Sequence, residues 1–456
     1  MFIGRDSELK LLSETISVSG KAVMIYGKRR VGKTSLIKEA FKLSASKCIY
    51  YECSKSPLDD NLKNLAAELV EAGVLPKGVL FKSIDDMFTF LGTLSTDIVI
   101  AIDEFPYLKY AEDNQYIDSV FQKIIDNDLS NISLIVSGSH ISMMQDLLDS
   151  NNALYGRFDT IIKLEELDYK EAAAFYPEKN EYDKVAFYSV FGGSPFVNSQ
   201  LDPNKDIKEN IIDTVLNETS SVYLYADKLL LSDLTDRQEV NAGRIFAVLG
   251  NGKKSYSETE SILKMDKTGN LNKQLAILME MQLISKRYPI NRESDDKKAL
   301  YETSDKLIRF YYTYVYKNRS KLAILGPEAF YSEYIEPSLT TYISYRFEDI
   351  CKQYFSLALN KGLYTGIRNI GTYYYDDSKK HTSGEFDIVL EYKDGYEIIE
   401  AKYYKNPISP EVISKEIEQI KSIEHINVKR IGFVSVNGFE KEDAAIDQIT
   451  GVDLYA

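Results

Sequence analysis

Eight consecutive residues near the N-terminus have the types and spacing of a phosphate-binding loop. The segment Gly27-Lys28-Arg29-Arg30-Val31-Gly32-Lys33-Thr34 matches the pattern G-x-x-x-x-G-K-[ST]. In such a loop the backbone N–H groups cradle phosphate oxygens, the lysine reaches the β- and γ-phosphates, and the hydroxyl ligates Mg²⁺. We therefore expect Lys33 to bind phosphate and Thr34 to bind the metal ion.

The segments that flank this loop favour a nucleotide site over a chance match. Residues 21–26 have the composition of a short buried strand, and residues 35–41 have helical spacing. The motif functions only as a strand–loop–helix unit, because the N-terminus of the helix must point at the phosphates. The sequence therefore predicts binding of ATP or GTP. The residues expected to bind the nucleotide here are Gly27, Lys28, Arg29, Arg30, Val31, Gly32, Lys33, Thr34 and Ser35.

Two adjacent carboxylates follow a strongly apolar segment. Residues 97–102 are too uniformly apolar for a half-exposed strand, so we expect a buried parallel strand followed by Asp103 and Glu104. Ligand sites in open α/β sheets lie at the carboxyl ends of the strands. We expect Asp103 to hold the Mg²⁺ shell and Glu104 to polarise the attacking water. The alternative is an Asp-Glu pair that only ends a strand and caps a helix.

Two further candidates in this part of the chain are Ser139 and Arg157. Ser139 follows the apolar strand 132–137, a position at which P-loop ATPases of the AAA-like and STAND-like groups sense the γ-phosphate. A simple Ser-Gly-Ser turn explains the same residues equally well. Arg157 follows a polar loop and is a candidate arginine finger, within the chain or toward a neighbouring subunit. An arginine that anchors its own loop is at least as good an explanation.

A second group of charged residues lies near the C-terminus. Residues 384–402 alternate as two strands of a hairpin with a turn at Lys393-Asp394-Gly395. Glu400 and Lys402 are two apart and share a strand face, and the hairpin folds them back toward Asp387. Two carboxylates and a lysine on one face can bind a divalent ion, activate water and stabilise a pentavalent phosphate. We expect these three residues to be catalytic.

The elements around this hairpin extend the pattern. A helix upstream carries Glu348 as a third carboxylate, a helix follows at residues 412–420, and a strand follows at residues 430–435. The expected metal ligands at this site are Glu348, Asp387 and Glu400. The alternative is an amphipathic hairpin with ordinary surface charges.

The predicted elements divide the chain into five segments. The first shows the alternation of strands and helices that is typical of a parallel sheet, with strands expected at residues 22–26, 47–51, 97–102, 132–137 and 160–164. The segments are an ATPase core (1–165), a helical lid (166–236), a winged helix-turn-helix (237–305), a Tyr-rich helical linker (306–345) and a C-terminal α/β restriction-endonuclease-like domain (346–456).

The winged-helix segment is predicted from three helical patterns, at residues 241–249, 257–264 and 268–281, followed by a two-stranded hairpin. Residues 237–303 carry 12 Lys plus Arg against 9 Asp plus Glu, a net charge of +3 in a chain of −14. The cations on its loops and edges are Lys253, Lys254, Lys267, Lys273, Lys286, Arg287 and Arg292. DNA binding by this segment is one interpretation. A packing or protein-interaction module is the other, since +3 is far from a strongly basic patch.

Composition restricts the remaining classes. The chain has 456 residues, with 44% hydrophobic and 27% charged residues, which is typical of a folded protein of several domains. Three widely spaced cysteines and three histidines argue against a Cys/His zinc site and a disulfide framework. No apolar segment approaches the ~20 residues that span a bilayer, and no secretion signal is evident at the N-terminus. We expect a cytoplasmic protein without a membrane partner.

Together these features resemble a family of P-loop ATPases that is predominantly archaeal and also bacterial. Its members carry an AAA-like or STAND-like ATPase core, a winged helix and a C-terminal domain related to PD-(D/E)XK nucleases. The resemblance covers nearly the whole chain and rests on Phe2-Ile3-Gly4-Arg5-Asp6-x-Glu8, the loop 27–34, Ile102-Asp103-Glu104, Ser137-Gly138-Ser139, Leu154-Tyr155-Gly156-Arg157, Gly192-Gly193-x-Pro195, and Glu385-x-Asp387 with Glu400-x-Lys402. It implies that Arg5 and Glu8 lie near the nucleotide. Phe386 stands where the nuclease signature has a proline, a departure that this superfamily often tolerates.

These expectations lead to one main functional hypothesis. We expect an ATP-binding and ATP-hydrolysing protein that uses Mg²⁺ and is coupled to a DNA-binding, nuclease-like C-terminal domain for Mg²⁺-dependent DNA processing. The alternative is a regulatory STAND-like switch whose nuclease-like domain is a non-catalytic binding module. A third class is an interaction protein in which the nucleotide sets the assembly state of a homo-oligomer.

Overall fold

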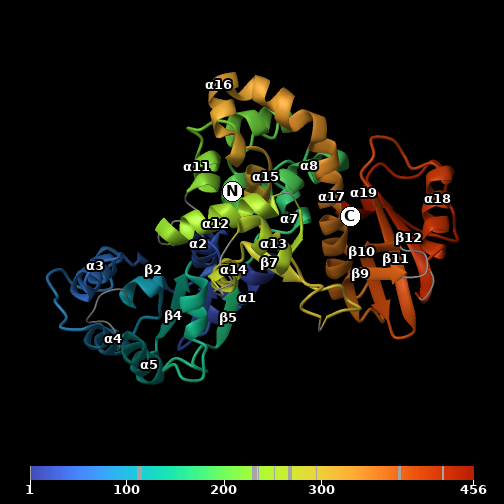
Figure 1. The fold of residues 1–456 in the computed structure, drawn as a ribbon. Coiled ribbons are helices and arrows are strands. Elements are labelled where there is room, and N and C mark those ends of the chain that lie inside the picture. Colours follow the sequence, from blue (N-terminus) through green and yellow to red (C-terminus); the bar gives the residue numbers. More distant parts are fainter. Residues whose placement is uncertain are drawn as a thin grey trace. The chain divides into compact units, whose positions relative to one another are not determined.

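The chain forms two compact units. One comprises residues 1–167 with 194–196, and the other comprises residues 168–193 with 197–456. The computed structural model (Figure 1) describes residues 2–109, 116–228, 234, 236–250, 252–264, 270–293, 295–377, 382–423 and 426–456. Over these residues no helix combines the length and the apolar composition needed to cross a membrane.

The first unit is built on a parallel five-stranded sheet with the order β2-β3-β4-β1-β5. The prediction of a parallel α/β sheet is confirmed, and each strand ends within one residue of its expected limits. The strands are β1 (Ala22–Tyr26), β2 (Lys47–Glu52), β3 (Ile98–Asp103), β4 (Ile132–Gly138) and β5 (Thr160–Lys163).

Helices cover both faces of this sheet because the side chains of its buried strands alternate between the two faces. Val23 and Ile25 of β1 pack in one core with α1 and α2, whereas Met24 packs in a second core with α3, α4 and α5. Several of these helices are labelled in Figure 1. The helices are α1 (Asp6–Ile16), α2 (Lys33–Leu43), α3 (Leu58–Glu71), α4 (Ile84–Gly92), η1 (Phe105–Lys109), α5 (Ile117–Asn127) and α6 (Ile141–Asp146).

Short helices follow β5, as expected for the segment 166–236. They are α7 (Tyr169–Ala173), α8 (Glu181–Phe191), α9 (Pro195–Asn198), α10 (Ile207–Asn210), η2 (Ile211–Val215) and α11 (Ser221–Asp227).

The next elements have the helix–strand–helix–helix–strand–strand order of a winged helix. They are α12 (Asp236–Leu249), β6 (Lys254–Ser255), α13 (Tyr256–Leu263), α14 (Asn270–Glu280), β7 (Ile284–Arg287) and β8 (Leu300–Thr303). The three strands form one sheet in the order β6-β8-β7. The short strand β6 was not among the predicted elements, and the expected start of the third helix at residues 268–269 lies outside the described residues.

The linker is helical, and its last helix continues past the predicted boundary at residue 345. The helices are α15 (Lys306–Tyr314), η4 (Tyr316–Asn318), α16 (Arg319–Phe330), η5 (Tyr331–Ile335) and α17 (Glu336–Asn360). Glu348 therefore lies in the middle of a 25-residue helix rather than near its start.

The C-terminal sheet has the order β13-β12-β11-β10-β9 and is mixed. The predicted hairpin is present as the antiparallel pair β10–β11, and β11, β12 and β13 are parallel. The edge strands β9 and β13 were not among the predicted elements. The elements are β9 (Asn369–Asp377), β10 (Thr382–Tyr392), β11 (Gly395–Lys402), α18 (Pro410–Lys421), β12 (Val428–Ser435), β13 (Asp447–Thr450) and α19 (Gly451–Tyr455).

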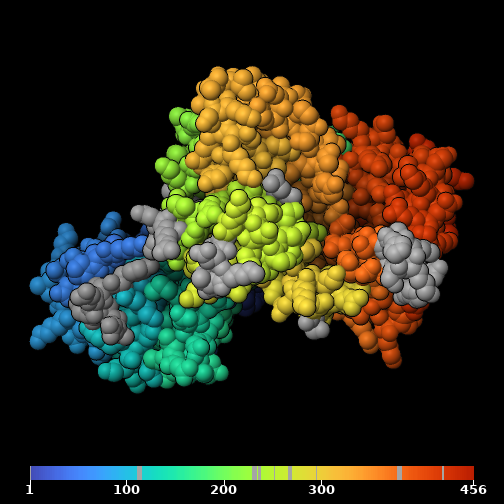
Figure 2. Space-filling model, in the orientation of Figure 1, coloured from blue at the N-terminus to red at the C-terminus, as the bar shows by residue number. Residues whose placement is uncertain are grey.

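The segment that follows β7 joins the winged helix to this sheet. The backbone N–H of Ile290 donates to the carbonyl of Thr372 on β9 at 2.8 Å. The Asn291 side chain both donates to the Tyr374 carbonyl (2.7 Å) and accepts from the Tyr374 N–H (3.1 Å). Figure 2 shows these yellow residues against the orange surface of the C-terminal sheet. The wing of the winged helix is therefore docked on the edge strand β9.

Candidate functional site

The P-loop connects β1 to α2, and its two glycines are required for different reasons. A Cβ atom on Gly27 would lie 2.1 Å from the carbonyl oxygen of Leu164, so only glycine allows this close approach of the backbone. Gly32 has φ +103°, a conformation that L side chains rarely adopt. These two positions place the loop amides and the N-terminus of α2 at the carboxyl end of the sheet, where phosphate is bound in such folds.

Lys33 is buried within its own loop. Its Nζ donates to the carbonyls of Gly27 and Lys28 at 3.0 Å each, and the residue is 6% exposed. The ammonium thus lies at the centre of the loop, where a phosphate group would be bound. Val31 is buried beside it, and Ser35 lies exposed in the first turn of α2.

Asp103 accepts hydrogen bonds from three hydroxyl groups. These come from Thr34 (2.7 Å), Tyr50 (2.6 Å) and Ser137 (2.6 Å). Burial alone would raise the pKa of Asp103, but these hydrogen bonds and the charge of Lys33 hold it below the usual value. Asp103 is therefore an anionic oxygen ligand beside the Thr34 hydroxyl, and this pair fits the oxygen chemistry that Mg²⁺ prefers.

Glu104 follows Asp103 in a left-handed backbone conformation with φ +51°. Such a conformation is strained for a residue with a side chain and is often found at functional sites. The Oε2 atom of Glu104 accepts hydrogen bonds from the Ser139 N–H (3.2 Å) and the Ser139 hydroxyl (2.9 Å). The structure thus brings together the two residues predicted to position water and to sense the γ-phosphate.

The other cations of the loop have partners within the first unit. Lys28 forms an ion pair with Glu166 (3.3 Å), and Arg29 donates to the Tyr107 hydroxyl (2.9 Å). The guanidinium of Arg30 lies 3.7 Å from the ring centre of Phe196. Sequence reasoning missed both aromatic residues. Phe196 directly follows the Gly192-Gly193-x-Pro195 signature, which was the available signal for a segment beside the loop.

Arg5 and Glu8, expected near the nucleotide from the resemblance, form an ion pair at 3.2 Å. Arg5 has φ +68° and also donates to the carbonyl of Glu165, two residues after β5. The N-terminal segment is thus tied to the end of the sheet that also carries the P-loop.

Arg157 is held by its own surroundings. Its Nε and Nη2 donate to the carboxylate of Asp126 at 3.0 and 3.1 Å, and its Nη1 donates to the carbonyl of Ala153 at 2.8 Å. This bidentate pair fixes the loop that precedes β5. Of the two interpretations left open for Arg157, the geometry favours the loop anchor.

In the second unit, Asp387 lies with Glu348 and Glu385 along a cavity of about 430 Å³. The Nζ of Lys253 approaches the Oδ1 of Asp387 at 3.6 Å. Burial and the negative charge of Asp387 raise the pKa of Glu348 to about 8. Lys253 reaches this acidic group from the segment just before β6, a position that no sequence signal identified.

Glu400 and Lys402 share a face of β11, as expected, and form an ion pair at 3.2 Å. However, the Nζ of Lys402 also donates to Glu416 of α18 at 2.7 Å. Burial raises the pKa of Glu400, and Lys402 partly offsets this shift. Lys402 is thus directed toward a second acidic residue that sequence reasoning did not consider.

The prediction that Asp387, Glu400 and Lys402 converge on one metal ion stays a prediction. A β-bulge interrupts the pairing of β10 with β9 between Phe386 and Val389, and both of these residues pack in one core with α18. The bulge does not alter the pairing of β10 with β11, in which Ile388 is opposite Ile399, so Asp387 lies opposite Glu400 and its charge helps to raise the pKa of Glu400. Over the described residues, no three His, Cys, Asp or Glu side chains are arranged to hold a metal ion.

The wing cations are also paired within the winged helix. Lys286 forms an ion pair with Asp296 at 2.7 Å, and Arg287 pairs with the buried carboxylate of Glu302. Lys286 and Arg287, like Lys253, therefore have carboxylate partners inside the chain, and Lys267 lies outside the described residues.

Comparison with known families divides the chain into two matched segments. Residues 2–199 match the model of an ATPase domain predominantly from Archaea. Residues 311–420 match archaeal and bacterial proteins of unknown function. The first segment is therefore an ATPase domain, and this implies that the site around Lys33 binds nucleotide.

Similar proteins are found among archaea. An uncharacterized protein of Methanocaldococcus jannaschii is 29% identical over 367 residues, which cover 79% of this chain and 78% of the relative. The Walker-type ATPase PABY2304 of Pyrococcus abyssi has a similar structure, with a TM-score of 0.51 and 18% identity over 68% of this chain and 96% of that one. The Aeropyrum pernix ORC2 protein is more distant, with a TM-score of 0.46 and 11% identity over 70% of this chain and 95% of that one. The similarity to the Pyrococcus protein supports the α/β fold described above.

Proposed function

We propose that the first unit hydrolyses ATP with Mg²⁺, with Glu104 as the residue that orients the attacking water. The observation that carries this proposal is the arrangement of four side chains at adjacent strand ends. Thr34 contacts Asp103, and Ser139 contacts Glu104, so a metal-binding pair and a water-positioning pair lie side by side. This is the arrangement that phosphoryl transfer to water requires.

Each residue then has a distinct task. Lys33 and the loop amides bind the β- and γ-phosphates. Asp103, which stays ionised because three hydroxyl groups donate to it, holds the metal shell together with Thr34. Bound Mg²⁺ would neutralise charge on the phosphate oxygens. Glu104 accepts a hydrogen bond from the attacking water, and Ser139 holds the Glu104 carboxylate in position.

The test is a pair of substitutions with separable effects. Lys33→Ala should weaken ATP binding, because it removes the ammonium at the centre of the loop. Glu104→Gln should leave binding nearly intact and slow turnover by about two orders of magnitude or more, as expected when a catalytic carboxylate loses its charge. Glu39→Gln, a change at a Lys42-paired residue of α2, is the control and should alter neither property. Parental turnover in Glu104→Gln would overturn the assignment.

For the winged-helix segment we propose a DNA-binding role under the control of the nucleotide state of the ATPase, with the C-terminal domain as a binding module that does not cleave. The winged-helix order and the net charge of +3 over residues 237–303 support DNA contact. The ion pairs of Lys402 with both Glu400 and Glu416 speak against cleavage, because they occupy the lysine that a nuclease would need. Mg²⁺-dependent cleavage, which the resemblance to PD-(D/E)XK nucleases implies, is the second candidate.

One set of assays distinguishes these functions. Supercoiled plasmid incubated with the full chain, ATP and Mg²⁺ or Mn²⁺ should stay intact, while duplex DNA should bind with an affinity that falls with salt at a log–log slope of roughly −0.9 per phosphate contacted. Nicking that disappears in Asp387→Ala would instead establish the nuclease. If the chain does not bind duplex DNA at low salt, a regulatory ATPase switch is the remaining function. A nucleotide-dependent change of mass in light scattering would instead indicate that the nucleotide sets the assembly state of a homo-oligomer.

A further inference from the structure

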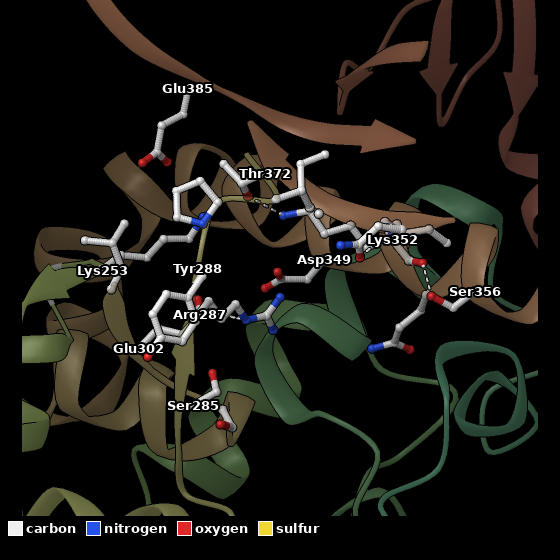
Figure 3. Close-up of a pocket in the computed structure, with 18 of the residues that line it drawn as sticks. Lys253, Ser285, Arg287, Tyr288, Glu302, Asp349, Lys352, Ser356, Thr372 and Glu385 are labelled. Atoms are coloured by element: carbon white, nitrogen blue, oxygen red, sulfur yellow. Dashed lines mark hydrogen bonds and ion pairs between the residues drawn. The ribbon is translucent and has the colours of Figure 1, made fainter. Parts of the chain in front are cut away.

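The second unit encloses a cavity of about 610 Å³ that the ATPase and DNA-binding functions do not use. Its walls come from β7 and the wing, the start of α15, the middle of α17, β9 and β10. Figure 3 shows the side chains that line it. The volume lies within the range of about 300–1,000 Å³ that is typical of small-molecule sites.

Lys352 of α17 lines this cavity and forms no ion pair with a described carboxylate. The only described group within hydrogen-bonding distance of its ammonium is the Thr372 hydroxyl, at 3.5 Å. Burial lowers the pKa of Lys352, and the charges of Asp349 and Asp387 offset only part of this shift. A half-buried ammonium without a carboxylate partner is costly, and an anion in the cavity would relieve that cost.

Two further cations lie close enough to Lys352 to affect it. The charges of Lys253 and Arg287 both lower its pKa, and all three residues line the cavity. Like charges gathered around one space repel each other unless an anion lies among them. The three cations come from different elements, so the packing of any one helix or strand does not explain their proximity.

The carboxylates in the wall are mostly compensated by other residues. Arg309 contacts Glu302 at 3.5 Å and Asp349 at 3.3 Å, and both carboxylates are well buried. Glu293 accepts a hydrogen bond from Asn369. Glu302, Asp349 and Glu293 thus have cationic or amide partners within the chain, whereas Glu385 is offset only by the charges of Lys253 and Lys352.

A hydroxyl group on another wall also lacks a partner. The Oγ atom of Ser285 on β7 is buried and makes no hydrogen bond to any described group. A buried hydroxyl without a partner costs about 1–3 kcal/mol. Ser285 and Lys352 therefore offer unused hydrogen-bond donors to the same cavity from two different elements.

We propose that this cavity binds a phosphate monoester of nucleotide size, with its phosphate held by Lys352, Arg287 and Lys253. A phosphate offers at least three acceptor oxygens in different directions, which matches donors on separate walls better than a planar carboxylate does. Glu385 on the adjoining wall is an acceptor for an amino group of a base. The ligand is either a free mononucleotide or the 5′-phosphate end of a nucleic-acid strand. This site is separate from the P-loop and does not depend on it.

The test uses the full chain with Lys33→Ala, so that the P-loop does not contribute to binding. Binding is measured by titration calorimetry with four probes: AMP, a 5′-phosphorylated trinucleotide, its 5′-hydroxyl counterpart and inorganic phosphate. The phosphorylated probes should bind at one site per chain. Tighter binding of AMP identifies a mononucleotide site, and tighter binding of the phosphorylated trinucleotide identifies a strand-end site. Adding Lys352→Met should weaken binding about tenfold or more, the effect of losing one charged hydrogen bond. Lys361→Met, at the exposed C-terminal end of the same helix, is the matched control.

A second measurement separates ligand binding from a structural role. Because Lys352 lacks a charged partner, Lys352→Met should raise the melting temperature of the free chain while it removes the stabilisation by AMP or the phosphorylated trinucleotide. A lower melting temperature in Lys352→Met would show that the lysine supports the fold. That lower melting temperature would overturn the proposal. So would unchanged binding of the phosphorylated probes in Lys352→Met, or no binding of any phosphorylated probe by the chain with Lys33→Ala alone.

Discussion

Glu104 and Ser139 are joined by two hydrogen bonds to a single carboxylate oxygen, one from the Ser139 amide at 3.2 Å and one from its hydroxyl at 2.9 Å. The two residues lie just beyond the carboxyl ends of the neighbouring strands β3 and β4. A displacement of the end of β4 would therefore move the carboxylate that we assign to the attacking water. In the mechanism that we propose, this contact would link the residue that senses the γ-phosphate to the residue that orients water.

Ser139→Ala should lower ATP turnover without loss of ATP binding, because the hydroxyl that positions Glu104 is removed while the loop stays intact. The decisive measurement is a double-mutant cycle with Glu104→Gln. Residues in direct contact give non-additive effects, so the double variant should be barely slower than Glu104→Gln alone. Fully additive losses would mean that Ser139 acts on the phosphate independently of Glu104.

Arg157→Ala and Asp126→Ala should both loosen the loop before β5, with the larger loss in Arg157→Ala because Arg157 also donates to the carbonyl of Ala153. The expected loss is about 1 kcal/mol of stability with little change in turnover. Hydrogen exchange of the β5 amides measures the loss of stability in each variant, and ATPase assays measure turnover. An arginine finger would behave differently, because only Arg157→Ala would then slow turnover, by about 10³-fold or more.

Gly27→Ala should destabilise the first unit by about 3 kcal/mol or more, because its Cβ would overlap the Leu164 carbonyl at 2.1 Å. Gly78→Ala is the matched control. Gly78 has φ +85° but nothing within 4 Å of its Cβ position, so only backbone strain of about 1–2 kcal/mol applies. Urea unfolding followed by hydrogen exchange at β1 compares the two. Equal losses would show that the loop shifts to admit a methyl group.

Glu348→Gln should stabilise the second unit at high pH. Burial and Asp387 raise the pKa of Glu348 from 4.5 to about 8, so its contribution to folding is fully present below pH 4.5 and is lost as pH rises through 8. Glutamine imitates the protonated form at every pH. The variant should match the parent at pH 5 and exceed its free energy of unfolding at pH 9, by an amount on the order of 3 kcal/mol. Glu336→Gln, at an exposed position of α17, should show no such difference.

The nucleotide site of the first unit could be placed from sequence because its signals are local. The P-loop is continuous, and the buried strands β3 and β4 are followed directly by the polar residues Glu104 and Ser139. Parallel strands bring such ends together at one edge of the sheet without further information. The contacts of Arg30 with Phe196 and of Arg157 with Asp126 needed the tertiary structure, because they join distant segments.

At the C-terminal site the strand pairing was predictable and the grouping of charges was not. Alternation correctly placed Glu400 with Lys402, and the turn correctly paired β10 with β11. The bulge between Phe386 and Val389, which shifts the pairing of β10 with β9, leaves no mark in the pattern of polar and apolar residues. Lys253 lies 134 residues before Asp387, and no local pattern could connect them.

The strand order of the first unit has a consequence for how the protein is made. β1 lies between β4 and β5, so the strand that leads into the P-loop pairs with partners synthesised more than a hundred residues later. Gly27 acquires its backbone neighbour only when Leu164 has been added. When the P-loop motif of a nascent chain has just been synthesised, the strands that support it are therefore still missing. Nucleotide cannot guide the early steps of folding. Pairing strands that lie far apart in the sequence is slow. Assembly of the sheet, rather than formation of the loop, therefore determines when a newly made chain can first bind ATP.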